Sequence, residues 1–137
     1  MYRKYLTEKK RKYKNSSLHP DFAEECIRKL TKLMEVDKIY RDSDLSLQIL
    51  AKKISIKPYL LSQIINERLK RNFYDYINSY RIEEAKQILV RPGRVKLNIV
   101  LLADEVGFKT RAAFYKTFKK NTNKTPKQFK REAGVMK

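Results

Sequence analysis

Two segments of the sequence carry side chains that suit hydrogen bonding to the edges of nucleic-acid bases. Gln63 and Arg111 each stand near the start of a stretch with helical periodicity that follows a short turn-like segment. Arg can bind guanine through two hydrogen bonds, and Gln can bind adenine in the same way. Few residues of the sequence suit catalysis. The only histidine, His19, precedes a proline in a polar stretch, and no phosphate-binding loop, nucleophile elbow or metal-ligand spacing occurs. We therefore expect no catalytic residue, no metal and no cofactor.

The remaining reactive side chains favour structural roles. Cys26, the single cysteine, falls on an apolar helical stripe, so we expect it in the core, and it has no partner for an internal disulfide. The adjacent carboxylates Glu83 and Glu84, like Asp104 and Glu105, point in different directions from a helix and cannot converge on one substrate atom. We expect these four carboxylates to be surface charges.

Length and charge favour a small basic binding protein. The 137 residues carry a net charge of +18, and the excess lies at the ends: residues 1–14 hold seven basic residues and one acidic, and residues 109–137 hold ten and one. The longest apolar run, residues 99–103, is far too short to cross a bilayer, so we expect a cytoplasmic protein without membrane insertion. Nucleic acid is the commonest partner of such a protein, and an anionic membrane surface is the next.

Apolar periodicity predicts an all-α fold of about seven helices. After an expected Asp21 cap, a first helix is expected over residues 22–34, and a short second helix runs from Leu45 to near Ser55. A third helix is expected with Pro58 in its first turn and with Leu61, Ile64 and Ile65 on its inner face. A long helix over residues 72–90 ends before Pro92 and Gly93. Two further helices are expected, one that ends at Val106 and one that runs from a Thr110 cap to Asn121, and a short last one begins at Thr125. We divide the chain into a basic arm (1–20), a first subdomain (21–71), a linker helix (72–91) and a second subdomain with a basic tail (92–137).

The second subdomain repeats the first. Leu102 and Ala103 follow the Leu50–Ala51 pair by 52 positions, and after one inserted residue Phe118 follows Ile65 by 53. Gly107 stands where a tight turn commonly needs a positive φ. Both subdomains are therefore expected to be helix-turn-helix units.

In such a unit the second helix enters the major groove of DNA. The expected base-reading side chains are Tyr59, Ser62 and Gln63 in the first unit and Arg111, Ala112 and Lys116 in the second. The expected phosphate contacts are Lys57, Lys109, Thr110 and Lys119, with Thr110 also capping its helix. The alternative is that Tyr59 and Tyr115 cover the edge of the core, while Arg111 and Lys116 are solvated helix charges.

The sequence resembles the DNA-binding domain of the AraC/XylS family of bacterial transcription regulators over residues 24–130. The motifs that carry the resemblance are LSLQILAKKI, YLLSQIINE and NFYDYINSYRIEEAKQIL in residues 45–89, and IVLLADEVGFKTRAAFYKTFKKNTNKTPKQFK in residues 99–130. It implies two helix-turn-helix subdomains of homeodomain-like form bridged by a long helix, and sequence-specific binding of double-stranded DNA by an activator. Asn123 and Ser55 replace frequent glycines of the family, and Asn tolerates a left-handed turn.

Most members of that family join this domain to a sensor, for which residues 1–20 leave no room, so the sequence resembles an output module. The expected partners are double-stranded DNA, RNA polymerase subunits and a sensor domain absent from this chain. The basic segment of residues 12–17 resembles the linker that precedes such domains in some regulators with membrane-embedded sensors. Two alternatives remain open: a nonspecific basic nucleic-acid-binding protein, and an interaction module whose arm, residues 3–14, binds a membrane or RNA polymerase.

Overall fold

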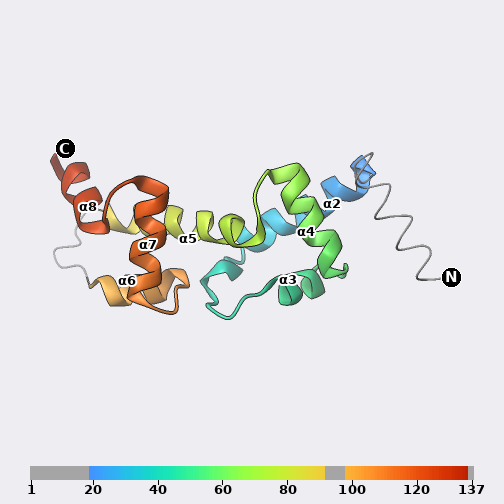
Figure 1. Ribbon diagram of the computed structural model, residues 1–137, viewed down its shortest axis with the longest axis horizontal. Helices are drawn as coiled ribbons and strands as arrows, with labels where there is room; N and C mark the ends of the chain where they lie inside the picture. Colours follow the sequence, from blue (N-terminus) through green and yellow to red (C-terminus); the bar gives the residue numbers. More distant parts are fainter. Residues whose placement is uncertain (1–18, 92–97, 136–137) are drawn as a thin grey trace.

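The structure, a computed structural model, describes residues 19–91 and 98–135, which form seven α-helices and one short 3-10 helix (Figure 1). The helices of the first half are α2 (Pro20–Glu35), η1 (Ile39–Arg41), α3 (Leu47–Lys53) and α4 (Pro58–Leu69). They are followed by α5 (Phe73–Leu89), α6 (Ile99–Val106), α7 (Arg111–Thr122) and α8 (Pro126–Val135). The described residues contain no strand, and the all-α prediction is confirmed.

The two halves begin their helix pairs with equivalent caps. The Ser46 hydroxyl accepts a hydrogen bond from the backbone N–H of Ile49 at 3.2 Å at the start of α3. Fifty-two positions later, the Asn98 side chain accepts from the N–H groups of Val100 and Leu101 at 3.0 and 3.2 Å at the start of α6. Ser and Asn are favoured at this position because their oxygens satisfy N–H groups that the first turn leaves unpaired.

The turns after these helices repeat the same backbone hydrogen bonds. The N–H of Ile56 donates to the carbonyl of Ala51 at 3.0 Å, and the N–H of Phe108 donates to that of Ala103 at 2.9 Å. The residue before each donor has a positive φ, +59° at Ser55 and +110° at Gly107. The predicted internal repeat is therefore present in the backbone itself.

The second helices of the two pairs also end alike. Helices α4 and α7 have 12 residues each and stop at left-handed residues, Lys70 with φ +57° and Asn123 with φ +60°. The next helix is then capped at Asn72, which accepts from Asp75 N–H at 2.8 Å, and 53 residues later at Thr125, which accepts from Gln128 N–H at 3.1 Å. Asn123 thus makes the turn predicted for it.

Helix α5 belongs to both hydrophobic cores. Its first half packs Phe73, Tyr76 and Ile77 into a cluster with buried residues of α2, α3 and α4. Its second half contributes Ile82, Ala85, Ile88 and Leu89 to a cluster with α6 and α7. The predicted linker helix over residues 72–90 is confirmed, because Asn72 and Val90 are its two caps.

Glu84 corrects one prediction from the sequence. The residue is only 7% exposed, whereas we expected a surface charge. Arg41, 43 residues earlier, donates from Nε to Glu84 Oε1 at 2.9 Å and from a terminal nitrogen to Oε2, and Lys38 Nζ lies 3.8 Å from Oε2. Burial by itself raises the pKa of the Glu84 carboxyl, but the hydrogen bond from Arg41 and the charges of Arg41 and Lys38 outweigh it and hold the pKa below its ordinary value.

Two predicted helix starts also differ. The N-cap of α2 is His19, whose Nδ1 accepts from the N–H of Asp21 at 3.3 Å, so Asp21 lies inside the first turn and is not the cap. Helix α3 begins at Leu47, while Leu45 is buried ahead of it. Cys26 is buried as expected, and burial raises the pKa of its thiol. The predictions for residues 3–14, 12–17, Pro92 and Gly93 lie outside the described residues.

Candidate nucleic-acid interface

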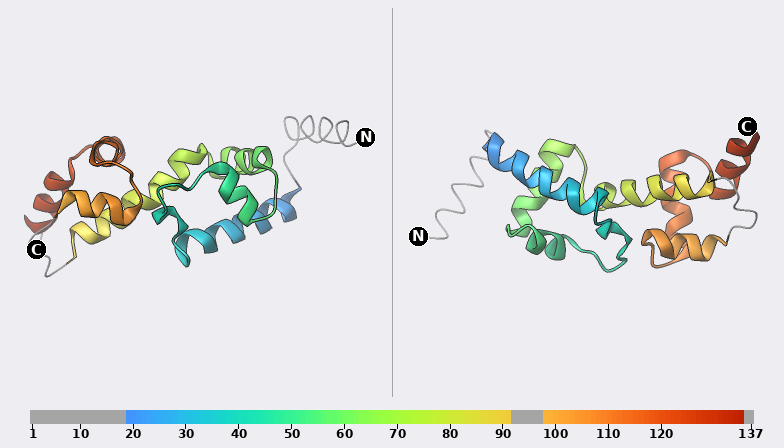
Figure 2. Two further views of the ribbon diagram at one scale, coloured as in Figure 1. Left: turned by 90° about the horizontal axis from the view of Figure 1, so that it is seen from below. Right: turned by 180° about the vertical axis from the view of Figure 1, so that it is seen from behind.

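Helices α4 and α7 lie on the same face of the elongated molecule. Figure 1 shows them in front, on either side of the middle of α5, and they run in the same general direction. Figure 2 shows from below and from behind that α2 lies on the opposite side. The second helix of each helix-turn-helix unit is therefore available to one extended ligand on one face.

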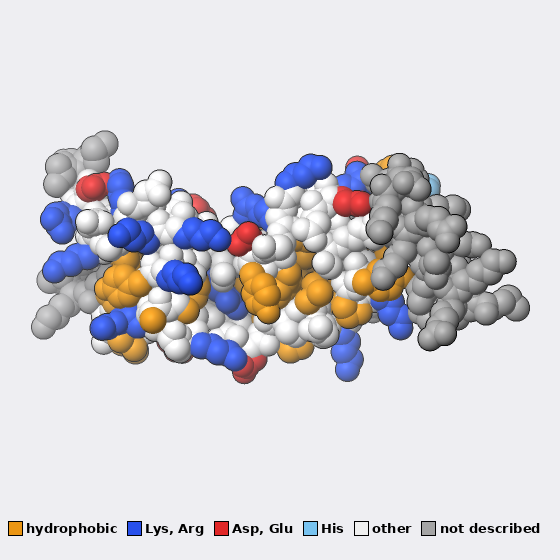
Figure 3. Space-filling view, viewed as in Figure 1, with side chains coloured by type: hydrophobic (Ala, Val, Ile, Leu, Met, Phe, Trp, Pro, Cys, Tyr) orange, Lys and Arg blue, Asp and Glu red, His pale blue; other side chains and the backbone are white. Residues whose placement is uncertain are grey.

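Helix α7 presents a cationic surface. Phe114 and Phe118 are completely buried beneath it, whereas Arg111, Ala112 and Lys116 are exposed. The sequence of α7 contains four basic residues and no acidic residue. In Figure 3, Lys and Arg side chains spread over the part of this face that α7 and α8 form. The three predicted base-reading residues of the second unit thus share one accessible helix face.

The start of α7 is held by the predicted cap. The Thr110 hydroxyl accepts a hydrogen bond from the N–H of Ala113 at 3.0 Å, and it retains its own proton as a donor. The Arg111 guanidinium carbon lies 6.0 Å from the centre of the Tyr115 ring, within cation–π range. The positive end of the helix dipole and Arg111 therefore coincide at the N-terminus of α7, which favours an anion there.

Helix α4 offers a different, largely neutral surface. Tyr59, Ser62 and Gln63 are half-buried, in contrast to the exposed side chains of α7. Gln63 Nε2 donates to Glu67 Oε1 at 3.1 Å, which occupies one donor of the amide that we expected to bind a base. In Figure 3, the middle of the surface over α4 shows hydrophobic and uncharged side chains.

The structure adds two side chains to the predicted set. Asn66 is exposed one turn after Ser62 and donates to the Ser62 carbonyl oxygen at 2.8 Å. Lys120 is exposed on α7, and its Nζ lies 3.9 Å from a carboxylate oxygen of Asp75 on α5. Helical spacing from Ser62 could have indicated Asn66, and the basic residues of α7 could have indicated Lys120, because apolar spacing marks the buried side of each helix.

Three of the four predicted phosphate contacts, Lys57, Lys109 and Thr110, lie around the two turns, and the fourth, Lys119, lies in the last turn of α7. Lys57 lines a hollow at the first turn together with Lys52 and Ser55. Lys109, in the second turn, pairs with Asp44 of the first unit at 3.1 Å, and both side chains are largely exposed. Because exposed ion pairs contribute little free energy, a phosphate can replace Asp44 at small cost. Lys119 is exposed on α7.

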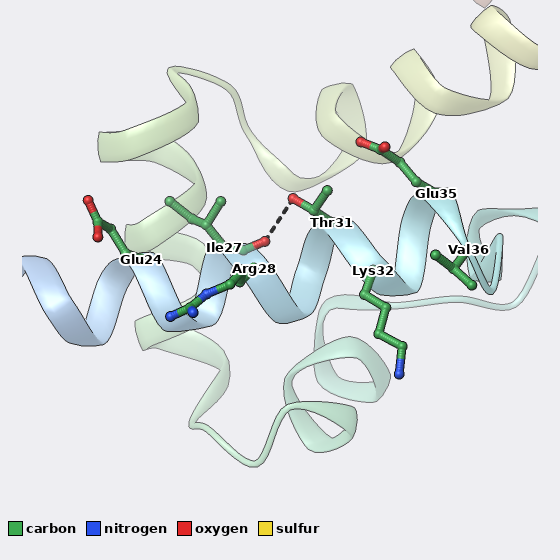
Figure 4. A pocket seen from close by; sticks show the side chains of 7 residues that line it. All are labelled: Glu24, Ile27, Arg28, Thr31, Lys32, Glu35 and Val36. Atoms are coloured by element: carbon green, nitrogen blue, oxygen red, sulfur yellow. Dashed lines mark hydrogen bonds between the residues drawn. The ribbon is translucent and has the colours of Figure 1, made fainter.

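A second hollow is lined by residues of α2 and by Val36, and its described lining includes no residue of α4 or α7 (Figure 4). Its described lining includes two carboxylates, Glu24 and Glu35, as well as Arg28 and Lys32, so it offers no excess of positive charge to a polyanion. Among residues 19–91 and 98–135, no three His, Cys, Asp or Glu side chains are placed to hold a metal ion. None of the helices in these ranges is long and apolar enough to pass through a membrane.

Comparison with known proteins assigns the fold. Residues 50–132, more than half of the chain, match the family model described as a helix-turn-helix domain. The C-terminal domain of AraT, a response regulator from Geobacillus stearothermophilus, superposes with a TM-score of 0.69 at 28% identity and covers 78% of this chain and 84% of that one. The chain belongs to the AraC-type helix-turn-helix family.

Further similarities agree with this assignment. The C-terminal domain of the two-component response regulator yesN from Fusobacterium nucleatum gives a TM-score of 0.65 at 30% identity, covering 79% of this chain and 97% of that one. An uncharacterized HTH-type transcriptional regulator of Staphylococcus aureus is 31% identical over 102 residues, 74% of this chain but only 13% of the relative. The Msm operon regulatory protein of Streptococcus mutans is 30% identical over 90 residues, 66% of this chain and 31% of the relative. The chain thus contains the DNA-binding domain of a helix-turn-helix transcriptional regulator, and it spans a minor part of these two relatives.

Proposed function

We propose that this AraC-type domain reads two successive major-groove segments of double-stranded DNA, one with α4 and one with α7. The observation that carries the proposal is the placement of two helices with equivalent backbones on one face (Figures 1 and 2). Successive segments of one DNA face lie about one helical turn, or 10 bp, apart. A monomer therefore has two reading helices for a bipartite site.

The two helices have different parts in this proposal. Arg111 and Lys116 suit guanine, and Ala112 suits a thymine methyl group, at the segment read by α7. Gln63, with Ser62 and Tyr59 beside it, reads the segment at α4 through neutral contacts after exchanging its bond to Glu67. Lys57, Lys109, Thr110 and Lys119 contact phosphates and orient the domain without reading sequence.

We further propose that the bound domain activates transcription by contact with RNA polymerase. The relatives, which are named as transcriptional and operon regulators, support a regulatory role, and activation is what the resemblance to the AraC/XylS family implies. Both relatives are several times longer than the region that matches. We therefore propose a sensor domain, attached to this domain or separate from it, as the second partner.

The alternative function is nonspecific binding of nucleic acid through the net charge of +18. To separate the two, purified chain is incubated with sheared genomic DNA of its source and excess random competitor at about 150 mM salt, where nonspecific electrostatic binding is weakened. We expect the retained DNA to share a motif of two blocks about 10 bp apart. Retention without a common motif, and unchanged by Gln63→Ala and Arg111→Ala, would replace the proposal with the alternative.

A further inference from the structure

Side-chain hydrogen bonds connect the linker helix α5 with the chain segment before α3. Three side chains, which we name the junction cluster, make them: Arg41 of η1, and Arg81 and Glu84 of α5. Arg41 forms two hydrogen bonds with Glu84, whose side chain is nearly inaccessible. The chain segment that precedes α3 is therefore bonded to the half of α5 that belongs to the second hydrophobic core, since Glu84 lies between Ile82 and Ala85 of that core.

Arg81 contacts both units at once. Its Nε donates to the Tyr40 carbonyl oxygen at 2.7 Å, and a terminal nitrogen donates to the Asp42 carbonyl oxygen at 3.1 Å, both in the first unit. Its guanidinium carbon lies 5.6 Å from the centre of the Phe108 ring in the second unit. One side chain of the linker helix thus connects the loop before α3 with the turn before α7.

The turn before α7 also contacts the first unit directly. A Cβ added to Gly107 would lie 2.3 Å from the Tyr40 carbonyl oxygen and 2.8 Å from Arg81 Nε. This contact leaves no space for the turn to move toward the first unit. Figure 1 and the right panel of Figure 2 both show the α6–α7 turn beside the segment between α2 and α3.

We propose that the junction cluster fixes the angle between α4 and α7 and so determines the half-site spacing that the domain accepts. The inference rests on the proposed two-helix reading. One inserted base pair rotates the second half-site by about 35° and moves it about 3.4 Å. Both helices can then bind only if α4 and α7 change their relative position at the junction. Helix α5 alone can bend, whereas the contacts of Arg81 with both units and the pairing of Glu84 with Arg41 oppose bending.

The DNA test uses the two-block duplex selected by wild-type protein and a series with one or two base pairs inserted or removed between the blocks. We expect wild-type affinity to fall about tenfold or more for one inserted pair, comparable to a mismatch. Arg81→Ala, Arg81→Lys and Glu84→Gln should reduce this loss to about threefold or less, with unchanged affinity for duplexes holding one intact block. The matched control is Glu83→Gln, since Glu83 is exposed and pairs only with Lys86 of its own helix among the described contacts. Variants that keep the wild-type spacing preference would overturn the inference.

A second measurement needs no DNA. Spin labels are attached after Asn66→Cys on α4 and Lys120→Cys on α7, where both side chains are exposed, while the native Cys26 is buried. The distance distribution should be narrow in wild-type background and in Glu83→Gln, and wide in Arg81→Ala and Glu84→Gln. Equal widths would overturn the inference even if DNA reading is confirmed. A one-block motif for the wild type would instead refute two-helix reading and the spacing role, while the label distances would still show whether the cluster fixes the helices.

Discussion

Gly107 packs against the backbone of Tyr40 so closely that a Cβ added to the glycine would lie 2.3 Å from the Tyr40 carbonyl oxygen. Gly107 also has φ +110°, a conformation that residues with a Cβ rarely adopt. The position therefore requires glycine for two independent reasons, the local turn and the contact between the two units.

We expect Gly107→Ala to lower the free energy of unfolding by about 3 kcal/mol or more, because backbone strain and a collision with backbone atoms add. Urea unfolding followed by circular dichroism measures this change. Gly134→Ala is the control, because no neighbouring atom lies within 4 Å of its added Cβ, and alanine in a helix is more stable than glycine by roughly 0.5–1 kcal/mol. Similar stabilities for both variants would contradict the tight contact at Gly107.

Glu84→Gln should lower stability at neutral pH by about 1–2 kcal/mol. Removing one partner of a buried pair costs more than that, but Arg41 is 45% exposed and recovers hydration. The folded pKa of Glu84 lies below its ordinary 4.5, so the contribution of the carboxylate is present above about pH 4.5 and is lost as the pH falls through the folded value.

Unfolding at pH 7 and at pH 3 tests this sign. The difference in the free energy of unfolding between wild type and Glu84→Gln should be smaller at pH 3 than at pH 7. Glu83→Gln should have nearly the same free energy of unfolding as wild type at both pH values. A difference that grows on acidification would show that the pKa of Glu84 is raised by folding and not lowered.

The sequence predicted the repeated helices and turns because they depend on local signals. Caps such as Thr110 and left-handed positions such as Asn123 act within a few residues, and apolar spacing marks which side is buried. The Arg41–Glu84 pair could not be predicted in this way, since its members lie 43 residues apart and Glu84 resembles any exposed helix carboxylate. The half-burial of Tyr59, Ser62 and Gln63 likewise depends on tertiary packing, which no local pattern contains.

Lys119→Ala tests the phosphate contacts. If the domain neutralises about 6 to 10 phosphates, its affinity should fall roughly 10³- to 10⁵-fold between 50 and 200 mM salt. Loss of Lys119 should reduce the slope of log affinity against log salt by about 0.9 and weaken specific and random duplexes by the same factor. Filter binding over a salt series measures both quantities. An unchanged slope would mean that Lys119 does not contact a phosphate.

Arg111→Ala should act differently from Lys119→Ala, although both residues are exposed cations of α7. Arg111 lies in the first turn of the helix, where side chains of a reading helix contact base edges, and its fork of donors suits guanine. We expect the variant to lose about 1–3 kcal/mol of discrimination at one base position and to bind random DNA nearly as well as wild type, apart from the loss of one charge. Competition with duplexes substituted at each position of the selected motif locates that base. Arg111→Lys serves as the charge-preserving control, and it should recover the affinity for random DNA but only part of the discrimination, because an ammonium group lacks the planar fork. Equal losses on specific and random duplexes for Arg111→Ala would assign Arg111 to the phosphate contacts and leave base reading by α7 to Ala112 and Lys116.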